Sequence, residues 1–207
     1  MKKINDISVV MISMNEEHAI ELVINNINTY VPGAEIIVVD SSSDNTPDIA
    51  RKFENVKLIR QYPPSGYNSA MGLALRSASK DYIVTLDCDN TYPAEMIPVF
   101  VDQLKSGFEI VDGSRLKSKP KNMPYLNYFA NLFFARLASV LFLKNIKDLH
   151  SGMRAYKKQL IDKITWNEQA DALPVELLLR AIKIKAKLKI IYIEYNVRIG
   201  DSKLRPL

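Results

Sequence analysis

The segment DYIVTLDCDN, residues 81–90, decides the predicted fold. Residues 81–87 are mostly β-branched or apolar, which is typical of a strand buried on both faces of a parallel sheet. The strand ends directly in two carboxylates, Asp87 and Asp89. Ligands of open parallel sheets bind beyond the carboxyl ends of the strands, so we expect these two side chains at a binding site.

Similar short runs precede this segment, and helical patterns separate them. The predicted strands are ISVVMIS at 7–13, AEIIVVD at 34–40 and VKLIR at 56–60. The predicted helices cover 15–31, 46–53 and 68–78. Strands that alternate with helices in this way predict βαβ units and a parallel sheet.

The chain after residue 92 is less regular. We predict a helix over 93–104, a strand over 108–115, a helix over 174–186 and a last strand over 188–195, followed by the polar tail RIGDSKLRPL. No stretch is long and polar enough to act as a linker. The sequence therefore predicts one α/β domain over 1–207, with a mostly parallel sheet flanked by helices.

The most apolar segment is YLNYFANLFFARLASVLFL at 125–143. Its 19 residues approach the length that spans a bilayer, but Arg136 lies in its middle and Asn127 and Asn131 share one side. These polar residues argue against a spanning helix. Two interpretations stay open, a core helix and a helix over 123–143 that lies in a membrane interface.

Composition excludes several classes of protein. The chain has 207 residues, 47% hydrophobic and 25% charged, which are globular proportions. A single cysteine, Cys88, excludes a disulfide framework and a zinc site built from several thiolates. The amino terminus lacks the long apolar core of a signal peptide, so we expect a cytoplasmic protein, peripheral on the membrane if 123–143 lies in the interface.

Charge divides unevenly along the chain. Residues 1–104 carry 8 basic and 14 acidic side chains, whereas residues 105–207 carry 20 basic and 9 acidic ones. The basic half predicts an anionic partner such as a phosphate or a lipid headgroup. We expect no nucleic acid partner, because the acidic half would repel a polyanion and Asp87 and Asp89 would have no role.

The pair Asp87 and Asp89 is the sharpest chemical signal. Two carboxylates at i and i+2 can share a hard divalent cation, and Mg²⁺ or Mn²⁺ fits such oxygen ligands. The alternative is a turn that is simply rich in Asp and Asn. The SMNEE turn after the first strand carries no Gly-rich phosphate loop, which argues against a dinucleotide-binding protein.

Six motifs in order carry a resemblance to a known family. They are ISMNEE at 12–17, IIVVDSSSDNT at 36–46, VTLDCDNTYP at 84–93, DGSR at 112–115, DLHSGMRAY at 148–156 and RIGDSK at 198–203. In their order and spacing the chain resembles the family 2 glycosyltransferases of the GT-A fold, which bind nucleotide-diphospho-sugars. Within that family it is similar to the dolichyl- or polyprenyl-phosphate mannose synthases.

The resemblance implies roles for individual residues. The donor-binding residues would be Ile12, Met14, Glu16, Val39, Asp40, Asp87, Cys88, Arg198 and Lys203, with 1–104 as the nucleotide-sugar half. Asp87, Asp89 and Thr91 would hold the metal, and Asp89 and Arg115 would be catalytic. Asp148, Arg154 and Glu176 would belong to the acceptor side, in the half 105–207. Ile12 and Met14 stand where the family usually has Pro and an aromatic residue.

The activity implied is metal-dependent transfer of a hexose from GDP-mannose, UDP-glucose or a similar donor to a polyprenyl phosphate, with inversion. One alternative is a family 2 enzyme with a soluble or glycan acceptor. A sugar nucleotidyltransferase is a further alternative, although it would normally carry a Gly-rich basic loop where this chain has SMNEE.

Overall fold

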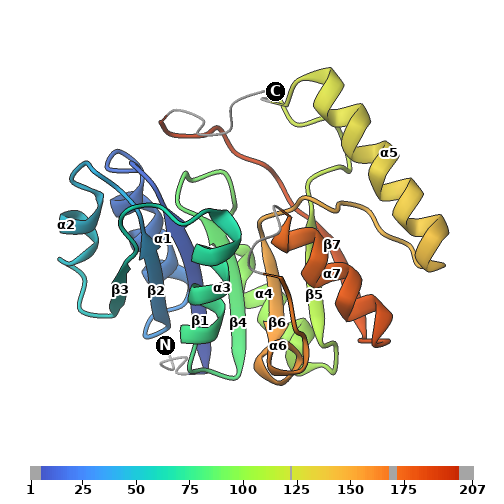
Figure 1. Ribbon diagram of the computed structural model, residues 1–207, viewed down its shortest axis with the longest axis horizontal. Coiled ribbons are helices and arrows are strands. Elements are labelled where there is room, and N and C mark those ends of the chain that lie inside the picture. Colours follow the sequence, from blue (N-terminus) through green and yellow to red (C-terminus); the bar gives the residue numbers. More distant parts are fainter. Residues whose placement is uncertain (1–5, 122, 168–171, 201–207) are drawn as a thin grey trace.

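The computed structural model describes residues 6–121, 123–167 and 172–200, and these build a single seven-stranded sheet (Figure 1). The strands are β1 (Ile7–Ser13), β2 (Glu35–Asp40), β3 (Val56–Arg60), β4 (Tyr82–Asp87), β5 (Ile110–Ser114), β6 (Arg154–Lys157) and β7 (Leu188–Tyr192). They lie in the order β3-β2-β1-β4-β6-β5-β7. All neighbours are parallel except β6, which runs antiparallel to both β4 and β5. The predicted α/β fold is confirmed.

Helices cover both faces of the sheet. They are α1 (Ile20–Tyr30), α2 (Thr46–Ala50), α3 (Tyr67–Ser77), α4 (Met96–Lys105), α5 (Tyr125–Phe142), α6 (Lys158–Lys163) and α7 (Leu173–Lys183). One hydrophobic cluster joins the sheet to α1 and α4, and a second joins it to α3, α6 and α7. In Figure 1 the first pair lies behind the sheet and α3 and α7 lie in front of it.

Strand β1 shows why both faces are covered. Val9 and Met11 belong to the cluster under α1 and α4, whereas Val10 belongs to the cluster under α3. Successive side chains of a strand point to opposite faces, so a continuous apolar run requires a hydrophobic layer on each side.

The structure corrects several boundaries and adds two elements. Helix α2 ends at Ala50 rather than at 53, α4 begins at Met96 rather than at 93, and α7 ends at Lys183 rather than at 186. Helix α1 begins at Ile20 rather than at residue 15, because residues 15–17 form a loop held by the loop after β2, where the Glu16 N–H donates to Thr46 Oγ1 at 2.8 Å. Strand β5 begins at Ile110, and β7 ends at Tyr192. Strand β6 and helix α6 were not predicted, since four and six residues give too little periodicity.

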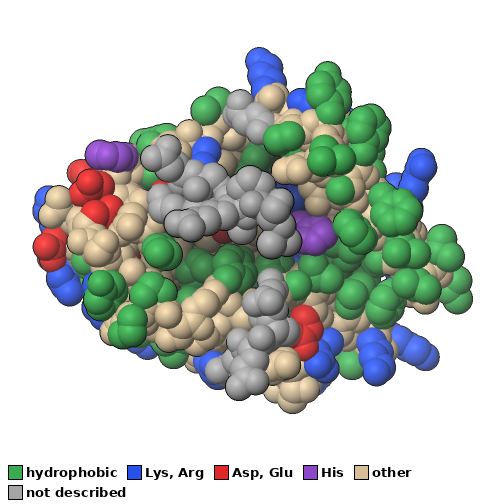
Figure 2. Space-filling view, turned by 45° about the horizontal axis from the view of Figure 1, so that its top comes forward, with side chains coloured by type: hydrophobic (Ala, Val, Ile, Leu, Met, Phe, Trp, Pro, Cys, Tyr) green, Lys and Arg blue, Asp and Glu red, His purple; other side chains and the backbone are tan. Residues whose placement is uncertain are grey.

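Helix α5 is not a core helix. Of its residues only Ala135 and Ala138 are buried, and Leu126, Phe129, Phe133, Val140 and Leu141 are 62–80% exposed. The core interpretation is therefore wrong for this segment. Within the described ranges, no helix combines the length and the hydropathy needed to cross a membrane. Figure 2 shows hydrophobic side chains gathered on the right of the molecule, where Figure 1 places α5.

Candidate active site

A pocket of about 330 Å³ opens at the carboxyl ends of β1, β2 and β4. It lies where the expectation for an open parallel sheet places a ligand. Seven residues predicted for the site line it: Ile12, Met14, Glu16, Asp87, Cys88, Asp89 and Arg198. Chain segments more than 180 residues apart thus meet here, since Arg198 contacts Glu16 across a separation of 182.

Asp89 is buried and held from two sides. Its Oδ1 accepts hydrogen bonds from the Thr91 backbone N–H at 3.0 Å and the Thr91 hydroxyl at 2.5 Å. Its Oδ2 pairs with Arg198 Nη1 at 2.8 Å. Thr91 was predicted as a metal ligand, and here it orients the carboxylate of Asp89. A direct role at a metal stays a prediction.

Arg198 links the two acidic sides of the pocket. Besides Asp89, its guanidinium donates to Glu16 Oε1 at 2.9 Å. The backbone around it runs along the loop after β4, because the Asn196 N–H donates to the Thr91 carbonyl and the Ile199 N–H to the Asp89 carbonyl. Residues 193–200 therefore run past the loop after β4 and bring Arg198 to the pocket, and Figure 1 shows this segment crossing above the sheet.

Asp87 is less buried than Asp89, and fewer partners stabilise its negative charge. Burial, and then the negative charge of Asp89, raise the pKa of Asp87 to about 7. Among the residues described, its carboxylate makes no hydrogen bond and no ion pair. Gly152 makes room for it, since a Cβ on that residue would lie 2.9 Å from Asp87 Oδ2 and 3.0 Å from the Tyr92 ring.

These residues fit a divalent cation. Two carboxylates supply hard oxygen ligands. The raised pKa of Asp87 indicates that a positive charge beside it would stabilise its ionised form. The 6–121, 123–167 and 172–200 ranges hold no cluster of three or more His, Cys, Asp or Glu side chains with metal-binding geometry. Water and the substrate's phosphates would therefore have to complete the shell, as is common for Mg²⁺.

Arg115 and Asp148 are partners of each other. Arg115 Nε and Nη2 donate to the two carboxylate oxygens of Asp148 at 2.8 and 3.0 Å, and the guanidinium stacks on the Tyr195 ring at 5.4 Å. Both side chains are largely buried. The predicted catalytic residue and the predicted acceptor residue thus form one bidentate pair, which neutralises much of the Arg115 charge. Their roles stay predictions.

Arg154 lies beneath the site. It is 1% exposed, pairs with Asp112 at 2.6 Å, and donates to the carbonyls of Asp148, Leu149 and Pro174. So deeply buried a residue acts by positioning the loop that carries Asp148 and the start of α7. Its predicted place on the acceptor side stays a prediction.

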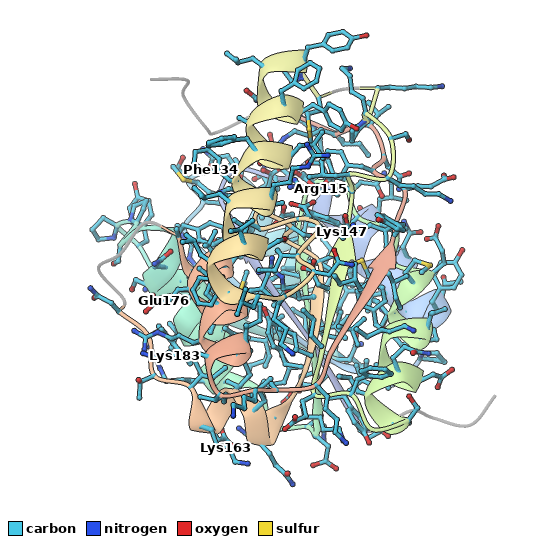
Figure 3. All side chains as sticks on the ribbon, turned by 90° about the vertical axis from the view of Figure 1, so that its right-hand side faces the viewer. Arg115, Phe134, Lys147, Lys163, Glu176 and Lys183 are labelled. Carbon is cyan, nitrogen blue, oxygen red and sulfur yellow. The ribbon has the colours of Figure 1, made fainter. Side chains whose placement is uncertain are left out.

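Three other predicted residues do not reach the pocket. Val39 packs in the core with α3, and Asp40 is buried beneath Ser41, held by Ser13, Ser42 and Arg60. Ser41 lines the pocket in their place. Glu176 pairs with Arg180 on α7 instead, and Figure 3 shows it away from Arg115. Lys203 lies outside the described residues.

The pocket also contains residues that were not predicted. They come from the segment before and within α3: Pro64, Gly66, Tyr67 and Ala70. The PPSGYNSAMG segment at 63–72 belongs to none of the six motifs, so the resemblance assigned it no role. The available signal was the pair Gly66-Tyr67, which directly precedes the helix predicted over 68–78.

Comparison with known proteins identifies the family. Residues 8–165 match the model of glycosyl transferase family 2. The chain is 40% identical over 203 residues to the dolichyl-phosphate hexose transferase of Haloferax volcanii, covering 98% of this chain and 88% of that protein. It is 29% identical to the dolichol-phosphate mannosyltransferase of Pyrococcus furiosus, covering 96% of this chain but only 59% of that protein.

Solved structures support the fold. Glucosyl-3-phosphoglycerate synthase from Mycobacterium tuberculosis, in complex with Mn²⁺, UDP and glucosyl-3-phosphoglycerate, matches with a TM-score of 0.75 at 22% identity. The match covers 98% of this chain and 73% of that one. The same protein is also solved with Mg²⁺ and UDP, at a TM-score of 0.73. Taken with the family model, these findings show that the chain is a glycosyltransferase and belongs to glycosyl transferase family 2.

Proposed function

We propose that the chain transfers a hexose from a nucleotide sugar to a polyprenyl phosphate at a membrane surface, with a divalent cation and with inversion. The name of the Haloferax volcanii relative supports both the hexose and the lipid phosphate. One observation on this chain carries the proposal furthest. The pocket lies at the carboxyl ends of the strands, and Figure 1 shows the long, exposed apolar helix α5 at the same end of the sheet.

The donor would enter the pocket from the side of α3. Met14 and Tyr67 line it and are 44% and 39% exposed, so they offer apolar and aromatic surface on which a nucleobase can pack. Glu16 and Ser41 provide acceptors and a hydroxyl for ribose. The diphosphate would then lie toward Asp87, Asp89 and Arg198, at the end of β4.

Charge on the leaving group decides the chemistry. A cation on Asp87 and Asp89 would stabilise the negative charge that grows on the diphosphate as the glycosidic bond breaks. Thr91 keeps the Asp89 carboxylate oriented for this role. Arg198 already faces the site and can turn from Glu16 toward the diphosphate. Residues 193–200 would exclude water from the pocket when they close over it.

The acceptor requires no strong base. A lipid phosphate is already anionic near neutral pH, so its oxygen can attack the anomeric carbon directly. Lys117, Lys119 and Lys121 precede α5 and can attract that phosphate, while the exposed apolar side chains of α5 meet the membrane. Figure 3 shows α5 as the outermost helix on this edge, with Phe134 on it and Arg115 nearby.

A comparison of two acceptors, each offered separately, distinguishes the proposed lipid acceptor from a soluble one. The purified chain would receive GDP-mannose or UDP-glucose with Mn²⁺, and either a polyprenyl phosphate in detergent or 3-phosphoglycerate. We expect hexose on the lipid alone, and none with the Asp89→Asn variant. Hexose transferred to 3-phosphoglycerate and not to the lipid would reject the lipid acceptor while leaving the transferase chemistry intact.

A further inference from the structure

A second concave site lies at the C-terminal end of α5, whereas Lys117, Lys119 and Lys121 precede its N-terminal end. It is a groove of about 550 Å³ between the residues after α5, the end of α7 and strand β7. Four lysines line it: Lys144, Lys185, Lys187 and Lys189. The remaining walls are mostly apolar and include Phe108, Ile182 and Leu188. It shares no lining residue with the donor pocket.

The backbone holds two exposed side chains at this groove at a conformational cost. Leu143 and Lys185 have φ of 51° and 61°, the left-handed region that glycine adopts without strain. Each follows the last turn of a helix, and the next residue closes the turn: Lys144 N–H donates to Ser139 O, and Ala186 N–H to Ala181 O. Glycine usually occupies this position. Leu143 is nevertheless 88% exposed, so packing does not explain it.

The groove is held in place by local hydrogen bonds. Ser139 Oγ accepts from the Ile146 N–H at 3.0 Å, which ties the loop carrying Lys144 back onto α5. On the other side, the Lys187 N–H donates to Glu109 Oε2 at 3.0 Å, and Lys189 Nζ lies 5.4 Å from the Phe108 ring centre. The ammonium groups are therefore presented from an ordered framework.

The exposed apolar side chains of α5 end next to the groove, because Leu143 directly precedes Lys144, which lines it. Leu126, Phe129, Phe133, Leu137 and Val140 recur at helical spacing on that face, and Leu143 follows them. An 18-residue helix is about 27 Å long, so lysines lie at both ends of an apolar stripe of that length. Figure 3 shows the lower end of α5 beside α7, where Lys183 is labelled.

We propose that this groove binds the phosphate headgroups of anionic phospholipids, with Leu143 inserted among the acyl chains. The proposal rests on the membrane location proposed above and adds a lipid site distinct from donor and acceptor. The apolar stripe and the lysines together fit an anionic membrane surface, which can contact both. A nucleic acid would leave the exposed leucines and phenylalanines without an apolar partner. Lysine suits this task as a point charge on a long apolar stem.

Sedimentation with vesicles tests the site. The full chain would be mixed with phosphatidylcholine vesicles, with or without phosphatidylglycerol. We expect binding that depends on phosphatidylglycerol and weakens with salt. The double variant Lys185→Gly/Lys187→Ala should bind about 25-fold more weakly, because each basic residue contributes a factor of about five. Lys52→Ala/Lys57→Ala, at the other edge of the sheet, is the matched control and should bind normally.

The glycine substitutions separate binding from folding. Lys185→Gly and Leu143→Gly relieve left-handed backbone, so their melting temperatures should equal or exceed that of the wild type while vesicle binding falls. Unchanged binding by the double lysine variant, equal binding to neutral vesicles, or no binding by the wild type would each overturn the proposal. Lysine-dependent binding by a chain that fails to transfer hexose would reject the proposed function alone.

Discussion

The raised pKa of the Asp87 carboxylate makes stability depend on pH. Its pKa is raised to about 7 in the folded chain, so between about pH 4 and pH 7 the folded state keeps a proton that the unfolded state has lost. Stability therefore falls as pH rises through that window. Without metal, Asp87→Asn should unfold at higher urea than the wild type at about pH 8, with a difference that shrinks toward about pH 4. A difference independent of pH would contradict this assignment.

Gly152 tests the geometry around the same carboxylate. A methyl group there meets Asp87 Oδ2 at 2.9 Å and the Tyr92 ring at 3.0 Å, so Gly152→Ala must displace one of them. We expect Mn²⁺ binding, followed by electron paramagnetic resonance, to weaken about tenfold, which is typical when a residue supporting a ligand is changed. Unaltered affinity would mean that Asp87 does not bind the cation in the geometry described.

The residues of the pocket differ in how far sequence could predict them. Asp87 and Asp89 follow an obvious strand, so their place at the edge of the sheet was predictable from periodicity alone. The pairing of Arg115 with Asp148 depends on side-chain directions from two distant loops, which no local pattern encodes. Tyr67 lines the pocket only because α3 begins where it does.

Among the elements, β6 depends on one buried ion pair. Arg154 on β6 pairs with Asp112 on β5 and donates to the carbonyl at the start of α7, so it joins three elements. Arg154→Ala would leave Asp112 buried and unpaired, and we expect a loss of about 3–5 kcal/mol in the free energy of unfolding. Chemical denaturation measures it. A loss as small as that of an exposed control, Arg51→Ala, would contradict the structural role.

Substitutions on the exposed face of helix α5, unlike Arg154→Ala, should change the free energy of unfolding very little. Phe129 and Phe133 are both 62% exposed, so Phe129→Ser/Phe133→Ser should change the free energy of unfolding by less than about 0.5 kcal/mol for each residue. The same variant should lose most vesicle binding. A large loss of stability would show instead that α5 packs against the domain in solution.

Prediction of the elements succeeded where periodicity was strong. The apolar runs of β1, β2 and β4 and the pattern of α1 were sufficient to predict a mostly parallel sheet. Strand β6 was not predicted because its four residues pair with strands that are 69 to 75 and 42 to 46 residues away in the sequence. For α5, apolar composition fits burial by protein and burial by lipid equally, so only the exposure in the structure excluded a core helix.

Across the whole molecule, the charged side chains and the exposed apolar surface are divided between the two halves of the chain. The acidic half supplies the carboxylates of the donor pocket, while the basic half supplies α5 and the lysines at both of its ends. Both halves contribute strands to one sheet, so the donor pocket and the segments that flank α5 belong to one framework. This arrangement suits an enzyme whose donor comes from water and whose acceptor stays in a membrane.

Transfer to lipid is the most direct measurement. Wild-type chain, GDP-mannose or UDP-glucose, Mn²⁺ and a polyprenyl phosphate would be incubated in detergent, and the lipid analysed by mass spectrometry and NMR. We predict a hexosyl-phosphate lipid of inverted anomeric configuration, absent with a chelator and absent with Asp89→Asn. A product that retains the donor's configuration, or that forms equally without the metal or with Asp89→Asn, would contradict the proposed mechanism. No lipid product from any donor would contradict the proposed acceptor.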